Sequence, residues 1–342
     1  MLSSQSELLL RNLDLFERGQ WMLVNPTDTQ IFTELKEYDI CGFHQYFDVF
    51  QAASVHCENQ TFGAAIPTGS STTIYDGIVI YLPKSKAHLD MLLANVRDVV
   101  DANGTIVVVG ANDGGIKSIG KRMKQQFGRA QKRDSARHCA IWCSPNKSSP
   151  APFRLDDYIK VNTYSVNQIN WQIASLPGVF SHGALDPGTQ LLLESLPQKL
   201  KPDILDFACG AGVIGCYLGK RQPDITLNFS DINALALYAC QRSCELNGLA
   251  ADIRPSNGLA EWSLQRFQLI ITNPPFHSGI ATDYEVSEKF IAEAGQHLRK
   301  NGDLYLVANR FLAYPELLDK HLNRAADLSR SNKYSVYHAI NS

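Results

Sequence analysis

DILDFACGAGVIG, residues 203–215, is the stretch of sequence that decides the fold of this chain. It begins as a short apolar strand, passes through a glycine-rich turn and enters a helix at Gly212. The next apolar stretch ends at Asp231, 21 residues after Gly210. A carboxylate at the end of a second strand can accept both ribose hydroxyls of a nucleoside. The stretch therefore predicts a nucleoside site at the carboxyl edge of an α/β sheet.

The residues after residue 200 alternate between strand and helix patterns. We predict strands at 203–208, 225–231, 251–254, 268–272 and 303–308, and helices at 212–220, 234–247 and 284–299. Strands separated by helices of this length indicate a mainly parallel sheet covered on both faces.

The first half of the chain repeats part of this pattern. A strand at 76–81 leads through a proline turn to a helix at 88–100, an Asn-Gly turn and a strand at 105–109. The same order recurs about 195 residues later, a period too long for a solenoid. We therefore predict two tandem Rossmann-like α/β domains, although two unrelated α/β halves can produce such a pattern by chance.

A segment rich in proline and serine, SPNKSSPAP at 144–152, is typical of a connection between domains. We place one domain at residues 1–150 and the other at residues 151–342. The boundary carries a tolerance of ten residues, because 153–176 can belong to either half. A length of 342 residues accommodates two domains more easily than one.

Composition restricts the class of protein. Hydrophobic residues make up 44% of the chain, which is enough for a packed core and excludes a disordered protein. The net charge of -2 excludes an overall polycation. We find no apolar run long enough to cross a bilayer and no basic segment typical of a signal peptide. We therefore expect no membrane partner and a cytoplasmic location.

The eight cysteines lack the spacing of a metal site, since none forms a C-x-x-C pair. Cys240 and Cys244 lie one helical turn apart, and we interpret them as small packing residues. We expect reduced cysteines and no bound metal.

The glycine-rich turn has more than one interpretation. It fits the pattern G-x-G-x-x-G, so a dinucleotide site is an alternative, and so is a tight turn without a ligand. Asp206 lies four residues before Gly210. A carboxylate at this position repels a pyrophosphate and favours a cationic ligand, such as S-adenosylmethionine with its sulfonium and ammonium groups.

NPPF at 273–276 directly follows the strand at 268–272 and is the most specific motif in the chain. The amide oxygen of Asn273 and the carbonyl of Pro274 can accept both hydrogen bonds of an amino group on a planar π-system, on which Phe276 can stack. Prolines hold the two acceptors rigidly because they fix φ. Accepting both N–H bonds turns the delocalised lone pair toward an electrophilic methyl group, so catalysis is mostly positioning. An ordinary proline turn is the alternative.

On these motifs the sequence resembles the class I S-adenosylmethionine-dependent methyltransferases over about residues 178–342. Within that class it resembles the bacterial ribosomal RNA guanine-N2 methyltransferases, in particular the small-subunit enzymes that modify guanine 1207 of 16S rRNA. The strings that carry the resemblance are LPGVF (176–180), GALDPGTQLLL (183–193), DFACGAG (206–212), NPPFH (273–277) and VANRFLAYP (307–315).

The resemblance also implies a degenerate first domain that has lost its cofactor site. Residues 1–150 contain no glycine-rich turn with a partner acid, and YLPK at 81–84 stands where NPPF is expected. By the same resemblance, residues 151–342 form the catalytic domain.

The resemblance assigns roles to individual residues of the second domain. At the methionyl part of S-adenosylmethionine it places Asp206, Ala208, Gly210 and Gly212. It places Asp231 at the ribose and Asn257 at the adenine. Thr189 and Gln190 are expected at the border of the cofactor site. It places Asn273, Pro274 and Phe276 on the target base, with His277 as a neighbouring substrate contact. Ala208 stands where the family usually has glycine. Its methyl group can crowd the cofactor slightly, so we expect an effect on cofactor affinity.

Basic residues concentrate between Lys117 and Arg137. This segment holds eight Lys or Arg and one acid, a net charge of +7, so the rest of the chain sums to -9. Such a stripe is typical of binding to a phosphate backbone, although a solvated helix face fits equally well. The candidate RNA contacts are Lys117, Lys121, Arg122, Lys124, Arg129, Lys132 and Arg133.

The leading hypothesis is methyl transfer from S-adenosylmethionine to the N2 amine of a guanine in 16S rRNA. The small ribosomal subunit is the expected partner, and we expect a monomeric enzyme. The alternatives are a large-subunit rRNA guanine-N2 methyltransferase and a release-factor glutamine methyltransferase, whose turn usually reads NPPY. A NAD-binding protein and a non-catalytic ribosome-assembly factor are alternatives from other classes.

A guanine amine within a duplex must leave the stack to reach the NPPF turn, so we predict base extrusion or an unpaired target.

Overall fold

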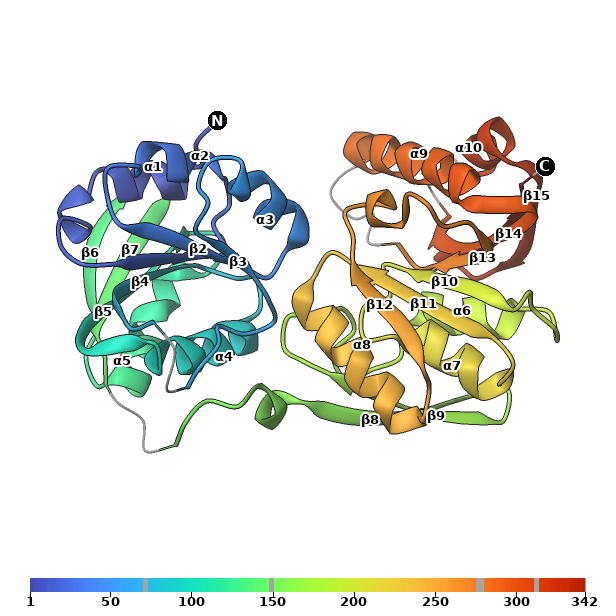
Figure 1. The fold of residues 1–342 in the computed structure, drawn as a ribbon, viewed down its shortest axis with the longest axis horizontal. Coiled ribbons are helices and arrows are strands. Elements are labelled where there is room, and N and C mark those ends of the chain that lie inside the picture. The colour runs from blue at the N-terminus through green and yellow to red at the C-terminus, as the bar shows by residue number, and fades with distance from the viewer. Residues whose placement is uncertain (70–72, 148–150, 275–279, 311–313, 342) are drawn as a thin grey trace. The chain divides into compact units, whose positions relative to one another are not determined.

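The computed structural model describes residues 1–69, 73–147, 151–274, 280–310 and 314–341. The chain divides into two compact units, Met1–Tyr158 and Ile159–Ser342. Each unit contains its own seven-stranded sheet (Figure 1).

The sheet of the second unit has the strand order β12-β11-β10-β13-β14-β16-β15. The first five strands in this order are parallel, β16 is antiparallel to β14, and β15 is antiparallel to β16. Sequence patterns predict the parallel strands but not this antiparallel pair. The strands are β10 (Asp203–Phe207), β11 (Thr226–Asp231), β12 (Ala251–Pro255), β13 (Phe267–Thr272), β14 (Leu298–Asn309), β15 (Asn323–Arg330) and β16 (Tyr334–Ile340).

Helices cover both faces of this sheet (Figure 1). One face carries α6 (Pro187–Ser195), α7 (Val213–Arg221) and α8 (Ala234–Asn247), and the other carries α9 (Ile280–His297) and α10 (Tyr314–His321). On the α9 face, Phe290 and Leu317 pack with Leu205 and Leu304 of the strands in one apolar core. Burial on both faces explains why the central strands read as continuous apolar runs.

A two-stranded hairpin, β8 (Lys160–Val166) and β9 (Ile169–Ser175), belongs to the second unit. Its Trp171 ring lies 5.0 Å from the Tyr217 ring of α7, and the Ala174 N–H donates to Ser243 Oγ of α8 at 3.0 Å. The hairpin therefore extends the layer formed by α7 and α8.

The sheet of the first unit has the order β3-β2-β1-β4-β5-β7-β6, which repeats the order of the second sheet position by position. Its strands are β1 (Trp21–Val24), β2 (Ile40–His44), β3 (Gln60–Phe62), β4 (Tyr75–Tyr81), β5 (Val100–Ala111), β6 (Gln131–Ala136) and β7 (Cys139–Pro145). Its helices are α1 (Ser4–Leu10), α2 (Gln30–Glu34), α3 (Phe47–Ser54), α4 (Lys86–Arg97) and α5 (Ile119–Phe127).

The repeat extends to single side chains. β5 and β14 are each 12 residues long and show the same order of buried and exposed positions. Asn146 Nδ2 donates to the carbonyls of residues 97, 100 and 101, and Asn341 Nδ2 donates to those of residues 295, 298 and 299. The two asparagines are 195 residues apart. The prediction of two tandem Rossmann-like domains is confirmed.

The first unit extends past the proline-rich segment to Tyr158. The backbone N–H of Phe153 donates to the Asp98 carboxylate, and the Phe153 ring lies 5.5 Å from the Tyr158 ring. The hydrogen bond ties this segment to the end of α4, and the ring contact joins the two ends of the segment.

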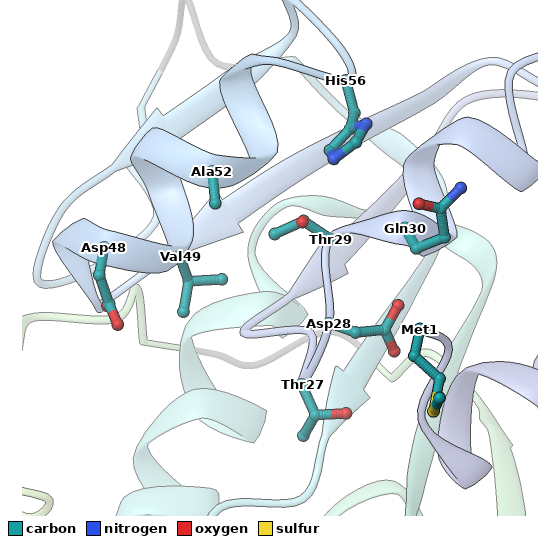
Figure 2. Close-up of a pocket in the computed structure, with 9 residues that line it drawn as sticks. All are labelled: Met1, Thr27, Asp28, Thr29, Gln30, Asp48, Val49, Ala52 and His56. Carbon is teal, nitrogen blue, oxygen red and sulfur yellow. The ribbon is translucent and has the colours of Figure 1, made fainter.

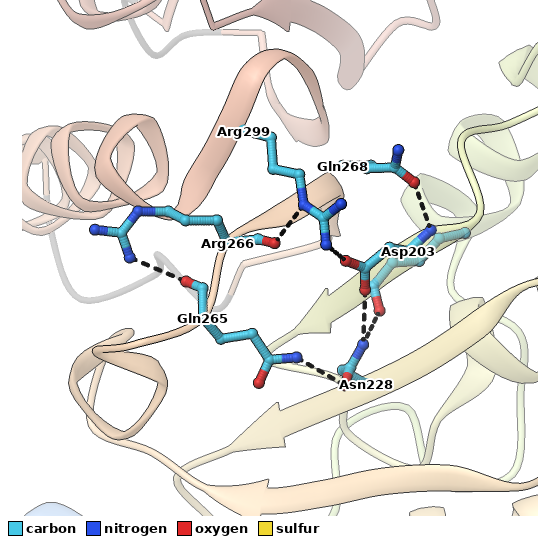
Figure 3. Close-up of polar contacts among 7 residues, drawn as sticks. Asp203, Asn228, Gln265, Arg266, Gln268 and Arg299 are labelled. Carbon is cyan, nitrogen blue, oxygen red and sulfur yellow. Dashed lines mark hydrogen bonds and ion pairs between the residues drawn. The ribbon is translucent and has the colours of Figure 1, made fainter.

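A polar cluster joins the strands of the second sheet at their amino ends (Figure 3). Arg299 Nη2 lies 2.7 Å from Asp203 Oδ2, and Gln268 Oε1 accepts the N–H of Asp203. Asn228 Nδ2 donates to the carbonyl of Ile204 at 3.0 Å. The cluster therefore lies at the edge of the sheet opposite to the carboxyl ends of the strands, where the candidate active site is located.

Candidate active site in the second unit

The glycine-rich turn connects β10 to α7 through left-handed residues. Ala208, Gly210 and Gly212 have φ values of 53°, 54° and 80°. A Cβ on Gly212 would lie 2.8 Å from Cys240 Sγ, so packing requires glycine there. A Cβ on Gly210 would meet no protein atom within 4 Å, so this glycine leaves open space above the turn, where a ligand can approach the backbone.

Asp231 at the end of β11 is held against this turn. Its Oδ2 accepts the N–H of Gly210 at 2.8 Å, and its Oδ1 accepts the N–H of Asn233 at 2.9 Å. Burial raises the pKa of Asp231, and the two backbone N–H groups act in the opposite direction. The acid and the turn that the sequence pairs across 21 residues are therefore in direct contact.

Asp206 lies beneath the turn rather than at its surface. It is fully buried, and its Oδ2 accepts the N–H of Gly215 at 2.8 Å. Its Oδ1 is buried and has no hydrogen-bond partner within the described residues. Burial raises the pKa of Asp206 to about 8, so in the ligand-free protein its charge develops only above neutral pH or when a cation favours it. Repulsion of a pyrophosphate by Asp206, as argued from the sequence, is correspondingly weaker.

Asn257 follows β12 at the same edge of the sheet. The backbone N–H of Ser256 donates to the carbonyl of Asp231 at 3.1 Å, which fixes the start of this loop, and the Asn257 side chain is exposed. The open space at Gly210 and the carboxylate of Asp231 fit a nucleoside cofactor.

Asn273 follows β13, and its amide is tightly held. Its Nδ2 donates to Asp186 Oδ2 and to Thr189 Oγ1, both at 2.9 Å. Pro274, the next residue, is buried. Phe276 and His277 lie outside the described residues, as does Pro275.

The start of α6 is therefore in direct contact with the turn that holds Asn273. Thr189 contacts Asn273, whereas Gln190 is exposed and donates to Glu194 Oε1 on its own helix. Sequence reasoning missed Asp186, although an aspartate followed by proline is a recognised helix start.

At the corresponding position of the first unit, polar side chains hydrogen-bond to one another. The strand registers align Asn25 with Ala208 and His44 with Asp231. Asn25 and Gln45 exchange two hydrogen bonds at 2.8 Å, and His88 Nε2 lies 2.7 Å from Gln45 Oε1. Burial lowers the pKa of His44, so a neutral imidazole replaces the carboxylate.

A cavity of about 400 Å³ opens in the first unit between the segment after β1 and α3 (Figure 2). Its lining includes no glycine, so it does not reproduce the site of the second unit. The lining residues are Met1, Thr27, Asp28, Thr29, Gln30, Asp48, Val49, Ala52 and His56.

The basic segment lies on α5 and β6 of the first unit. Three of its arginines are paired: Arg122 with Asp90, Arg133 with Asp14 and Arg137 with Glu7. The remaining cations are exposed and form no ion pair with another described residue; they are Lys117, Lys121, Lys124, Arg129 and Lys132.

All eight cysteines are free. The described residues contain no group of three or more side chains able to hold a metal. No helix in the same part of the chain is long and apolar enough to cross a membrane.

Comparison with known proteins identifies two family domains. Residues 6–162 match the Methyltransferase small domain N-terminal, and residues 170–338 match the Methyltransferase small domain. Ribosomal RNA small subunit methyltransferase C of Pseudoalteromonas atlantica is 45% identical, over 98% of this chain and 99% of the relative. The protein of that name from Alteromonas mediterranea is 42% identical, over 99% of both chains.

A solved structure shares the fold of the whole chain. It is the T. thermophilus 16S rRNA N2 G1207 methyltransferase (RsmC) in complex with AdoMet and guanosine, with a TM-score of 0.85 and 21% identity. The alignment covers 99% of this chain and 92% of that one. Identity above 40% over nearly the full length shows that the chain belongs to the ribosomal RNA small subunit methyltransferase C family.

Proposed function

We propose that the protein transfers a methyl group from S-adenosylmethionine to the exocyclic N2 amine of guanine 1207 in 16S rRNA of the small ribosomal subunit. The observation that carries this proposal is the amide of Asn273, whose two N–H groups are both engaged by α6. Among the described residues its Oδ1 has no hydrogen-bond donor, so it can accept a hydrogen bond from an amino group.

The chemistry follows from that acceptor. When bound, S-adenosylmethionine supplies a methyl group on a sulfonium, with Asp231 and the open backbone at Gly210 as its binding edge. The N2 amine of guanine is a weak nucleophile because its lone pair is delocalised into the ring. Asn273 Oδ1 accepts one N–H of this amine and orients the lone pair, so positioning supplies most of the rate enhancement. The methyl–sulfur bond would break as the methyl–N2 bond forms, which leaves the thioether S-adenosylhomocysteine, and the proton that N2 loses would pass to water.

The alternatives differ in substrate. A large-subunit rRNA guanine-N2 methyltransferase shares the layout, and a release-factor glutamine methyltransferase has a related turn that usually reads NPPY. Small-subunit rRNA is favoured because the full-length relatives carry that name. The solved T. thermophilus structure contains guanosine, which supports a guanine target.

We place the phosphate backbone of the rRNA on the first unit. Lys117, Lys121 and Lys124 are exposed around α5, whereas Arg122 and Arg133 of the predicted set are paired with acids. Exposed cations without partners attract phosphates more strongly than neutralised ones. An enzyme of ribosome modification is expected in the cytoplasm, and we propose that it acts as a monomer on an extruded or unpaired guanine.

The test is mass mapping of rRNA from a deletion strain, with purified protein added back to 16S rRNA and to small subunits. We expect one methyl group to be missing at guanine 1207 and to be restored by the protein with S-adenosylmethionine. A full set of small-subunit methyl groups in the deletion strain would refute the assignment, and loss from large-subunit rRNA would favour the alternative.

A further inference from the structure

The first turn of α6 contacts the catalytic turn directly. Asn273 Nδ2 donates to Asp186 Oδ2 and to Thr189 Oγ1, each at 2.9 Å. Asp186 Oδ2 also accepts the backbone N–H of Thr189 at 2.8 Å, so Asp186 is the N-cap of α6 as well. Two hydrogen bonds thus connect side chains of one helix turn to the amide of Asn273, and a third holds Asp186 to Thr189.

This network determines which way the amide of Asn273 faces. A side-chain amide has two N–H donors and one carbonyl acceptor. Both donors are used, so Oδ1 is the atom left for an incoming amino group. If the amide turned over, Oδ1 would face the carboxylate oxygen of Asp186, and two acceptors at hydrogen-bond distance repel each other.

We propose that Asp186 and Thr189 are positioning residues for methyl transfer, which hold Asn273 with Oδ1 toward the amine of the target base. The inference rests on the proposed function. Neither side chain touches the reacting atoms, because both act through Asn273. Thr189 then belongs to the substrate side of the site rather than to the border of the cofactor.

The surroundings keep the network compact. Thr189 is 5% exposed, so water has little access to its hydroxyl. A Cβ on Gly188 would lie 3.0 Å from Asp186 Oδ2 and 3.2 Å from Cδ1 of Tyr334 on β16. Glycine at this position therefore allows the aspartate to stay within reach of Asn273.

The first unit has a corresponding contact between its first helix and the end of β4, but a tyrosine replaces the asparagine. Ser6 is the third residue of α1, as Thr189 is of α6, and Ser6 Oγ lies 2.7 Å from the Tyr81 hydroxyl. The strand registers align Tyr81 with Asn273. A phenol has no acceptor that must be turned toward a substrate, so this pair is a matched control for the structural part of the contact.

The experiment compares variants of the full-length protein in methyl transfer to its rRNA substrate. Asp186→Ser keeps a good N-cap but is too short to reach Asn273, and we expect kcat to fall roughly 10- to 100-fold. Asp186→Asn keeps both the cap and an acceptor oxygen and should restore most of the rate. Thr189→Val should lower kcat about 3- to 10-fold, whereas Thr189→Ser stays near wild type.

Binding and stability readouts separate positioning from structure. We expect the calorimetric Kd for S-adenosylmethionine to change less than about threefold in all four variants. Tyr81→Phe and Ser6→Ala should lower the melting temperature while leaving kcat unchanged. Wild-type kcat in Asp186→Ser and Thr189→Val would overturn the inference while leaving the proposed function intact. A wild-type protein that transfers no methyl group to guanine would instead refute the proposed function.

Discussion

The backbone N–H of Gly210 donates a hydrogen bond to Oδ2 of Asp231 at 2.8 Å. This bond joins the turn after β10 to the end of β11, two segments that are separated in the sequence by a whole helix. The turn and the acid form one edge of the site. Substitutions in the turn are therefore expected to change cofactor affinity and not only stability.

Gly210→Ala should mainly weaken cofactor binding, whereas Gly215→Ala should mainly lower the stability of the second unit. The Cβ at residue 210 meets no protein atom within 4 Å, so the variant should lose only about 1 kcal/mol of stability from its positive φ. Because the methyl group enters the open space, we expect at least about tenfold weaker binding of S-adenosylmethionine in calorimetry. The Cβ at residue 215 would lie 2.2 Å from the Phe229 ring and should destabilise the unit by about 2 kcal/mol or more. Wild-type affinity in Gly210→Ala would contradict a cofactor at this edge.

Asn273→Ala should strongly reduce methyl transfer and spare cofactor binding. Loss of one acceptor aimed at the amine should lower kcat by about 100- to 1,000-fold, as for an oriented hydrogen-bonding group in other active sites. Transfer of radiolabelled methyl to rRNA measures the rate, and calorimetry measures the affinity for S-adenosylmethionine. Tyr81→Phe, at the aligned position of the first unit, is the control. An active Asn273→Ala protein would refute the assigned role.

The stability of the ligand-free second unit should depend on pH through Asp206. Burial raises the pKa of Asp206 to about 8 from an ordinary value of 3.8. The folded protein therefore keeps a proton that the unfolded chain releases, and the free energy of unfolding should fall as pH rises from about 4 to 8. Asp206→Asn does not titrate and should show a shallower dependence. Hydrogen exchange of β10 and α7 across this range measures the difference; equal slopes would contradict the assignment.

Removal of the exposed cations on α5 should weaken RNA binding in a salt-dependent way. Each phosphate contact contributes about 0.7 to 0.9 to the slope of log K against log salt. The triple change of Lys117, Lys121 and Lys124 to Ala should therefore lower the slope by about 2. Arg122→Ala, which removes a cation paired with Asp90, is the matched control and should change the slope much less. An unchanged slope in the triple variant would place the RNA elsewhere.

Asn146 and Asn341, which directly follow β7 and β16, should make equal contributions to their own units. Asn146 and Asn341 each bind three carbonyls where α4 leads into β5 and where α9 leads into β14. Replacement by Ala removes this donor from carbonyls that are mostly half-buried and should cost about 1–3 kcal/mol in either unit. Hydrogen exchange resolves the two units in the full-length protein. A large loss in one unit and none in the other would argue against equivalent roles.

Much of the fold could be predicted because buried parallel strands and glycine-rich turns have strong local signals. The apolar runs at 203–208 and 268–272 predict two strands, and the bounds of β10 and β13 differ from these ranges by one residue each. β15 was missed because NRAADLSR has no apolar alternation, and it is a strand only through its pairing with β16.

The candidate site divides in the same way. Asp231 and Gly210 were predicted together because their spacing repeats a known local motif. Asp186 was missed because its contact with Asn273 spans 87 residues, and no short-range pattern reports such a contact.

The amino-acid sequence by itself determined that this chain has two α/β halves, a glycine-rich turn with a partner acid, and an NPPF turn, because these depend on local periodicity and backbone chemistry. Only the tertiary structure decided that Asp206 is buried beneath the turn, that three arginines of the basic segment are neutralised, and that α6 orients Asn273. Burial, charge pairing and amide orientation depend on which distant segments meet, and that is settled when the sheets assemble.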